Sequence, residues 1–283
     1  MTGEKWRELG EQIKLIICDM DGTLLNENKE ISAKNREAIR YAKSRGVDFS
    51  LCTGRIHIMT ECYCQELAQE FPIIAANGAV VWDPIKKISL WELPMDTKEA
   101  LRIIDYGEKH DLDYIAITAK GCYYSKKSIR KQRFLQYNTI ATQKGYETMK
   151  VLPIEEGIET LKRESIYKIL ICEVQETRYQ QVEHFLQTLQ QTEYTSSEPT
   201  LLDISCKGVS KGAGLERLSN IMEIPREAIC AMGDYENDIS MLQYAGLGVA
   251  MGNASDVVKA KADYITDTNE EDGVANLIER LLR

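Results

Sequence analysis

Short, largely apolar segments alternate with helical patterns over the first third of the chain. "KLIIC" (14–18), "VDFSLC" (47–52) and "PIIAA" (72–76) have the length and character of buried strands. Between them, residues 31–46 and 56–68 carry apolar residues at helical spacing, and Ser32 and Gly46 are the predicted N-cap and stop of the first helix. Strands that alternate with helices predict parallel pairing, with helices on both faces of the sheet.

The middle of the chain has a different pattern. Residues 97–112 and 177–191 are predicted helices, and the remaining apolar segments, 113–124, 166–174 and 194–206, are typical of antiparallel strands. Alternation of helix and strand returns after about residue 207. The sequence therefore predicts an α/β fold, with a Rossmann-like, doubly wound parallel-sheet core (residues 1–83 and 208–283) and an inserted α+β domain (residues 84–207).

Composition and charge exclude several kinds of partner. The chain has 283 residues and a formal net charge of −9, which argues against a nucleic-acid partner because such proteins usually carry a basic surface. No uninterrupted apolar run reaches the roughly 18 residues of a membrane span, and the polar N-terminus does not have the pattern of a signal peptide. Most of the eight cysteines lie in apolar runs, as reduced thiols of a cytoplasmic protein do.

Acidic residues follow two of the predicted strands directly. "DMDGT" (19–23) and "GDYEND" (233–238) bring five acids to the ends of strands, four of them aspartates: Asp19, Asp21, Asp234 and Asp238. Ligands of open α/β sheets bind at the carboxyl ends of the strands, so these side chains are expected to converge. Carboxylates brought so close raise one another's pKa values or require a cation. Hard oxygen donors without histidine or cysteine favour Mg²⁺ as that cation.

A phosphate ester is the substrate that this arrangement suits, since Mg²⁺ is commonly held by carboxylates together with phosphate oxygens. "TGR" (53–55) follows another predicted strand, and Lys211 begins a predicted helix. The Thr53 hydroxyl, the backbone N–H groups of the Thr53–Gly54 turn and the Lys211 ammonium could all donate to one phosphate. Gly22 would allow the backbone to approach the ligand closely.

Four motifs occur in a recognisable order: "DMDGT", "TGR", "SKGAGL" (210–215) and "GDYENDISML" (233–242). Together they resemble the haloacid dehalogenase superfamily of phosphohydrolases. "NGA" (77–79), "VAMGNA" (249–254) and the insertion between the second and third motifs resemble the Cof-type subgroup (type IIB, C2B cap). The resemblance extends over essentially the whole predicted core.

The resemblance implies a role for each matching residue. Asp19 would be the nucleophile that forms an aspartyl-phosphate, and Asp21 would be the general acid and base, with its backbone carbonyl on Mg²⁺. Asp19 and Asp234 would bind the metal, and Asp238 would orient the site without binding the metal directly. The implied substrate contacts are Gly22, Thr53, Gly54, Arg55, Asn77, Lys211 and Asn237.

Several alternatives stay open at this point. Asp238 could simply begin a helix, Asn77 could be a turn former, and Arg55 could brace the inserted domain. The basic run between Lys126 and Arg133 is interpreted as solvated surface, or else as an attractor of anionic substrates. The predicted activity is a Mg²⁺-dependent phosphatase of small phosphomonoesters such as sugar phosphates. A phosphomutase or other phosphotransferase, or a non-catalytic metabolite sensor, are the alternatives, and the sequence indicates neither the substrate nor the oligomeric state.

Overall fold

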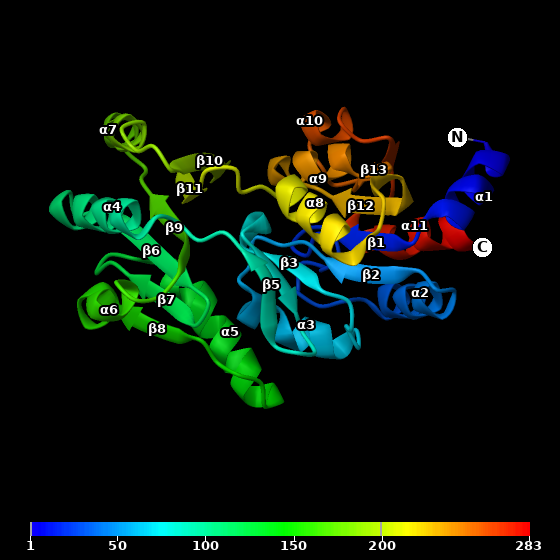
Figure 1. Cartoon of the computed structure of the whole chain (residues 1–283), viewed down its shortest axis with the longest axis horizontal. Helices are drawn as coiled ribbons and strands as arrows, with labels where there is room; N and C mark the ends of the chain where they lie inside the picture. Colours follow the sequence, from blue (N-terminus) through cyan, green and yellow to red (C-terminus); the bar gives the residue numbers. More distant parts are fainter. Residues whose placement is uncertain (1, 199) are drawn as a thin grey trace. The chain divides into compact units, whose positions relative to one another are not determined.

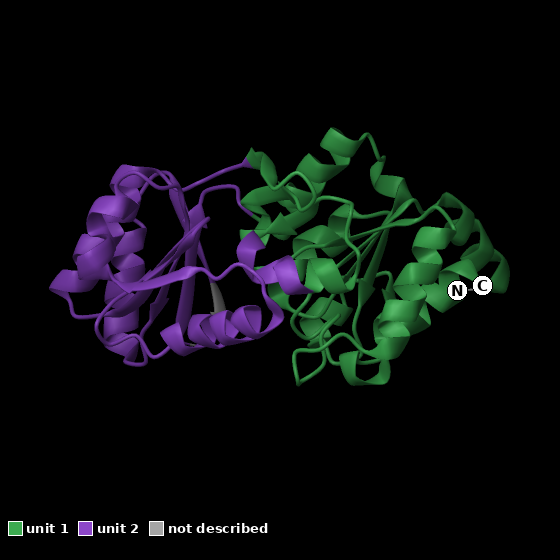
Figure 2. Cartoon of the chain, turned by 90° about the horizontal axis from the view of Figure 1, so that it is seen from below, with its two compact units in different colours: residues 1–55, 63–91, 210–283 green, residues 56–62, 92–209 purple. Residues whose placement is uncertain are grey.

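The computed structural model describes residues 2–198 and 200–283, and the chain folds into two compact units (Figure 2). Unit 1 takes residues 1–55, 63–91 and 210–283, and unit 2 takes residues 56–62 and 92–209. The main divisions fall at 91/92 and 209/210, whereas the sequence placed domain limits at 83/84 and 207/208. Those limits stay a prediction.

A five-stranded parallel sheet forms the centre of unit 1 (Figure 1). The chain passes from β1 to β2 on one side of β1 and later places β12, β13 and β14 on its other side, so the direction of winding changes beside β1. This topology confirms the predicted parallel-sheet α/β core. The sheet order is β14 (Tyr264–Ile265), β13 (Leu247–Ala250), β12 (Ile229–Gly233), β1 (Leu15–Cys18) and β2 (Asp48–Leu51).

Helices cover the sheet of unit 1. Leu15 and Ile17 of β1 share an apolar cluster with α8 (Lys211–Met222) and α9 (Ile239–Tyr244), and alternate side chains of the strand, Ile16 and Cys18, point to the opposite face. The other helices of the unit include α2 and α11, which pack against each other, and α1, which contacts α11. Their bounds are α1 (Gly3–Gln12), α2 (Ala33–Ser44), α3 (Glu61–Glu66, shared with unit 2), α10 (Asp256–Lys259) and α11 (Gly273–Leu282).

A small second sheet adjoins β2. Its strands are β3 (Ile73–Ala75), β4 (Val80–Asp83) and β5 (Ile88–Glu92), in that order. A parallel bridge between Cys52 and Ile74 connects it to the end of β2, and β3 pairs antiparallel with β4 across the short turn 76–78. Because β5 belongs to this sheet, most of it clusters with unit 1 although the sequence placed it in the insertion.

Unit 2 is built on a six-stranded mixed sheet (Figure 1). An apolar cluster joins one face of this sheet to α4 (Thr97–Lys109), α6 (Ile154–Leu161) and α7 (Glu176–Leu186), while α5 (Lys131–Lys144) contacts β8. The α+β character of the insertion agrees with the prediction. The sheet order is β10 (Thr192–Glu198), β11 (Leu201–Cys206), β9 (Ile166–Cys172), β6 (Asp113–Thr118), β7 (Gly121–Tyr124) and β8 (Lys150–Pro153).

The prediction of two helices in the insertion was wrong, because α5 and α6 are also present. The buried side chains of α5 are only Phe134, Tyr137 and Ala141, so its apolar face is narrow and its sequence is dominated by polar residues. In α6, Gly157 weakens the helical pattern, and its Cβ would lie 2.0 Å from the ring of Tyr123. Among the described residues, no helix is both long and apolar enough to cross a membrane.

Candidate active site

The carboxyl ends of the parallel strands of unit 1 carry the predicted site. Asp19 follows β1, Asp234 follows β12, and Thr53 lies two residues beyond β2. These strands are neighbours in the order β12-β1-β2, so the three residues lie at the same edge, beside the change of winding direction. Lys211 is the first residue of α8, where the Ser210 hydroxyl caps the helix by accepting a hydrogen bond from Ala213 N.

Lys211 forms two buried ion pairs. Its Nζ lies 2.6 Å from Asp19 Oδ1 and 2.5 Å from Asp238 Oδ1, and the three side chains are at most 8% exposed. Burial alone would lower the pKa of Lys211, but the two carboxylates outweigh burial and hold that pKa above its usual value. The lysine therefore stays charged, and it partly neutralises the two carboxylates that it contacts.

The carboxylates of Asp19, Asp234 and Asp238 form a tight cluster whose oxygens lie within 4.8 Å of one another. Burial raises the pKa of Asp19 to about 7; Lys211 acts in the opposite direction, and the two other carboxylates add to the rise. Burial likewise raises the pKa of Asp234 to about 6. The single positive charge of Lys211 therefore does not balance the cluster, and a further cation would favour the ionised forms of Asp19 and Asp234.

The two acids of the last motif have different surroundings. Asp238 Oδ2 accepts hydrogen bonds of 2.9 Å from the backbone N–H groups of Asp234 and Tyr235, while its Oδ1 contacts Lys211. Asp234 Oδ1 accepts a 2.7 Å hydrogen bond from the Thr23 hydroxyl. Both oxygens of Asp238 are therefore engaged by the protein, which suits a residue that orients the site, and the same contacts place it at the turn before α9.

The donor set fits a hard divalent cation. The cluster offers carboxylate oxygens without histidine or cysteine, as the sequence indicated, and it is the one such group that the described residues contain. Gly22 has a left-handed φ of +88°, and a Cβ at this position would lie 2.4 Å from Asp234 Oδ2. Glycine therefore suits the close approach of the first motif to Asp234, while the expected approach of this backbone to a ligand stays a prediction.

Asp21 does not join the acidic cluster. Its two oxygens accept hydrogen bonds of 2.8 Å from Nε and Nη2 of Arg55, and Lys29 Nζ lies 3.0 Å from Oδ1. Arg55 also lies over the ring of Tyr63, at 5.2 Å from its centroid. The observed partner of Arg55 is therefore the predicted acid and base, a contact that the sequence did not suggest. The sequence did not indicate Lys29 as a partner of Asp21, because Lys29 lies in a loop outside the four motifs.

The second motif forms a tight loop under a neighbouring turn. Thr53 is 1% exposed, and its Oγ1 accepts a 3.1 Å hydrogen bond from Arg55 N, which leaves its O–H proton available as a donor. A Cβ on Gly54 would lie 2.8 Å from Asn77 Oδ1, so a larger residue at this position would displace that side chain. Asn77 in turn accepts a 3.2 Å hydrogen bond from Asn237 Nδ2. All the residues that the motifs singled out lie in unit 1.

The basic run at residues 126–133 lies in unit 2. Lys126 Nζ is 3.0 Å from Glu155, and Lys127 pairs with Asp111. Both lysine side chains are more than half exposed, which agrees with the interpretation of this run as solvated surface. Their charges are partly offset by these two acids.

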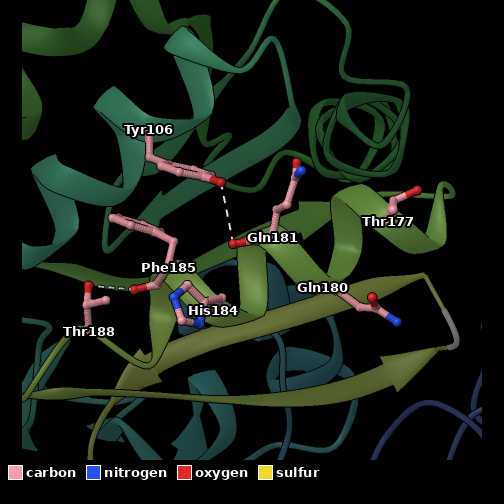
Figure 3. Close-up of a pocket in the computed structure, with 7 residues that line it drawn as sticks. All are labelled: Tyr106, Thr177, Gln180, Gln181, His184, Phe185 and Thr188. Atoms are coloured by element: carbon pink, nitrogen blue, oxygen red, sulfur yellow. Dashed lines mark hydrogen bonds between the residues drawn. The ribbon is translucent and has the colours of Figure 1, made fainter.

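An open hollow of about 580 Å³ occurs in unit 2, and none of its lining residues is a predicted site residue (Figure 3). Tyr106 of α4 stacks on Phe185 of α7 at its wall, with ring centroids 4.0 Å apart. The hollow contains no carboxylate, so the chemistry predicted from the motifs belongs elsewhere. Its lining residues are Tyr106, Thr177, Gln180, Gln181, His184, Phe185 and Thr188.

Comparison with known proteins identifies the class to which this fold and site belong. The haloacid dehalogenase-like hydrolase family matches residues 16–278, and the chain belongs to this family. The resemblance of the four motifs to Cof-type members is thereby confirmed. A solved haloacid dehalogenase-like hydrolase from Bacteroides thetaiotaomicron superposes with a TM-score of 0.81 at 29% identity, covering 95% of this chain and 99% of the other.

Curated relatives carry the names of phosphatases. The 5-amino-6-(5-phospho-D-ribitylamino)uracil phosphatase YcsE of Bacillus subtilis (strain 168) is 35% identical, with 94% of each chain covered. The pyridoxal phosphate phosphatase YbhA of Escherichia coli (strain K12) is 30% identical, covering 94% of this chain and 97% of the relative. The protein is accordingly a phosphoric monoester hydrolase, which favours the phosphatase over the mutase and sensor alternatives.

Proposed function

We propose that this phosphatase hydrolyses small phosphomonoesters, such as sugar phosphates or related metabolites, in a Mg²⁺-dependent reaction through an aspartyl-phosphate on Asp19. The observation that carries the proposal is the buried cluster at the carboxyl ends of β1 and β12. There, Asp19 lies 2.6 Å from Lys211 and within 4.8 Å of Asp234 and Asp238. Carboxylates that could serve as the nucleophile and the metal ligands therefore lie in one small volume with the Lys211 ammonium.

In the first half-reaction, an Asp19 carboxylate oxygen would attack the phosphorus atom of the ester. The bond between phosphorus and the leaving oxygen breaks, and the leaving oxygen takes a proton from Asp21. Asp21 is held by Arg55 and Lys29 in the structure, so it would exchange these partners for the leaving oxygen as the substrate binds.

In the second half-reaction, water would attack the phosphorus of the aspartyl-phosphate. Asp21, now a carboxylate, takes a proton from that water, and the acyl-phosphate bond breaks to release inorganic phosphate and regenerate Asp19. Splitting one displacement into two steps lets a single acid donate and then accept a proton.

Lys211 and the loop 53–55 would hold the transferring phosphoryl group. The Lys211 ammonium offsets its negative charge, and the Thr53 hydroxyl and Gly54 N–H donate to its oxygens. Asn237 lies next to Asp238 and would add a further polar contact to the substrate. Because Lys211 is 2% exposed, its charge acts in surroundings where water screens it little.

Asp19, the backbone carbonyl of Asp21 and Asp234 would hold the Mg²⁺, and Asp238 would keep Lys211 and the turn 234–235 in place. A bound Mg²⁺ would supply charge neutralisation for the acids and for the phosphate. Asp19 must be ionised to act as the nucleophile, and burial disfavours its ionisation. A neighbouring cation would offset this effect of burial.

The cysteines support a reducing, cytoplasmic location for this activity. All eight are free thiols, and six of them are buried. A protein that works in an oxidising compartment would more often link such residues in disulfides. We therefore keep the cytoplasm as the proposed location.

A panel of phosphorylated metabolites tests the proposal. It would include hexose phosphates and the two compounds named by the relatives, the phosphoribitylaminouracil and pyridoxal phosphate. Each is assayed with Mg²⁺ and with EDTA, and kcat/KM is compared. We expect hydrolysis of at least one small phosphomonoester, abolished by EDTA and restored by Mg²⁺. Activity that persists in EDTA would contradict the metal requirement.

Phosphorus NMR of the products separates hydrolysis from transfer. We expect inorganic phosphate to accumulate from a hexose phosphate at the rate at which the ester disappears. An isomeric hexose phosphate in its place would show that the protein acts as a mutase.

A further inference from the structure

Three consecutive residues between β3 and β4 have left-handed backbone conformations. The φ angles are +51° at Ala76, +56° at Asn77 and +103° at Gly78. Glycine adopts such angles freely and asparagine tolerates them, but an alanine in this region costs about 1–2 kcal/mol. The surroundings must hold the turn in place, and strained backbone of this kind is concentrated at functional sites.

The turn is fixed to the loop of the second motif. Asn77 N donates a 3.0 Å hydrogen bond to Thr53 O, and Ala76 N donates a 2.8 Å hydrogen bond to Arg55 O. The side chain of Asn77 lies directly over Gly54, where a Cβ would be 2.8 Å from Asn77 Oδ1. Backbone and side chain of the turn thus define the position of residues 53–55.

The same turn packs closely on the start of α8. A Cβ on Gly78 would lie 2.0 Å from Ser210 O, and a Cβ on Gly214 would lie 2.7 Å from Gly78 Cα. The backbone of the turn therefore packs directly against the backbone at the start of α8, with no side chain between them. Since Lys211 follows Ser210, the turn also defines where the first residue of α8 lies.

Asn77 further contacts the fourth motif. Its Oδ1 accepts a 3.2 Å hydrogen bond from Asn237 Nδ2, between residues 160 positions apart in the sequence. The Oδ1 of Asn237 is buried and has no hydrogen-bond partner among the described residues. A buried amide oxygen without a partner is costly, so a ligand that donates to it would be favoured.

We infer that Asn77 is a positioning residue, which acts on the substrate through Asn237 rather than by touching it. By accepting from one N–H of Asn237, it fixes the plane of the amide on the residue that precedes Asp238. The second N–H and the buried Oδ1 of Asn237 are then presented to the substrate. This role rests on the proposed function, and it replaces the direct substrate contact that the motif comparison implied for Asn77.

Asn77→Gly tests the inference, because glycine keeps the left-handed turn and removes only the amide. We expect kcat to fall about tenfold, as for loss of a group that orients a reacting side chain, with folding stability maintained. Asn237→Ala should lower kcat as well. If Asn77 acts through Asn237, the Asn77→Gly/Asn237→Ala double variant should match Asn237→Ala within about twofold.

Three kinetic results would overturn the inference. If the two single losses multiply in the double variant, Asn77 acts independently of Asn237, and a rise in KM at constant kcat would indicate direct substrate binding. If Asn77→Gly has wild-type kinetics, the residue is only a turn former. Glu223→Gly is the matched control: Glu223 is an exposed residue with φ +54° at the end of α8, so kinetics should not change.

The side-chain amide resonances of Asn237 give a readout that does not depend on activity. In ¹⁵N–¹H NMR spectra they should move in Asn77→Gly and stay in place in Glu223→Gly. If the wild-type protein hydrolyses nothing on the panel, the proposed function fails. The NMR measurement still shows whether Asn77 holds the side chain of Asn237. Unmoved Asn237 resonances in Asn77→Gly would overturn the positioning role.

Discussion

Replacing Lys211 with methionine removes an ammonium group from between two buried carboxylates and keeps a side chain of similar length. Asp19 and Asp238 lie 2.6 and 2.5 Å from that ammonium and are at most 8% exposed. Removing one partner of a buried ion pair typically costs about 3–5 kcal/mol, because the remaining charge is left uncompensated. Here two carboxylates lose their cation.

We therefore expect the free energy of unfolding of metal-free Lys211→Met to be lower by about 4 kcal/mol at pH 8. The melting temperature should fall by roughly 10 °C, given the usual scaling for a chain of this size. Hydrolysis of p-nitrophenyl phosphate should also be lost, since the phosphoryl group would no longer meet a cation at this position.

Urea unfolding in EDTA, followed by circular dichroism, measures the change. Lys109→Met is the matched control, because Lys109 pairs with Asp105 at 2.6 Å while both side chains are more than 60% exposed. Such an exposed pair contributes under about 0.5 kcal/mol. If Lys211→Met unfolds at the same urea concentration as the control, the account of a buried charge network at the site is refuted.

Three further predictions follow from contacts of the same site. Gly22→Ala places a Cβ 2.4 Å from Asp234 Oδ2 at φ +88°, so it should destabilise the protein by about 2 kcal/mol and weaken Mg²⁺ binding in calorimetry; wild-type values would contradict the close approach. Burial raises the pKa of Asp19 to about 7 in the folded protein, from 3.8 in the unfolded chain. The neutral side chain therefore stabilises the fold fully below about pH 4, and this stabilisation is lost as the pH rises through 7. In EDTA, the stability of Asp19→Asn relative to wild type should increase by about 4 kcal/mol between pH 4 and 8, and a constant difference would be inconsistent with the raised pKa. Arg55→Lys loses the bidentate hydrogen bonds to Asp21, so kcat should fall about 10- to 100-fold while the melting temperature stays similar. An unchanged kcat would show that these hydrogen bonds are dispensable.

The position of the site could be predicted from the sequence because two simple rules combine. Residues that follow neighbouring parallel strands meet at one edge of the sheet. Because β12 pairs with β1, where the direction of winding changes, Asp19 and Asp234 come together. Local pattern and strand order therefore account for the acidic cluster without knowledge of the side-chain contacts.

Contacts between distant loops could not be predicted in this way. Arg55 and Asp21 are 34 positions apart, and their pairing depends on how two loops approach after the sheet has formed. The contact of Asn77 with Asn237 depends likewise on the left-handed turn 76–78, which the letters "ANG" only suggest. Helix α5 was missed because its buried face is narrow, so tertiary packing outweighs its weak pattern.

The most direct test of the central claim is the kcat/KM of Asp19→Asn with p-nitrophenyl phosphate in saturating Mg²⁺, compared with wild type. Asparagine keeps the shape of the side chain and removes the nucleophilic carboxylate. The account predicts a loss of at least about a thousandfold, since the covalent route is closed. Asp19→Asn that hydrolyses the ester at the wild-type rate would contradict the assignment of Asp19 as the nucleophile and, with it, the proposed mechanism.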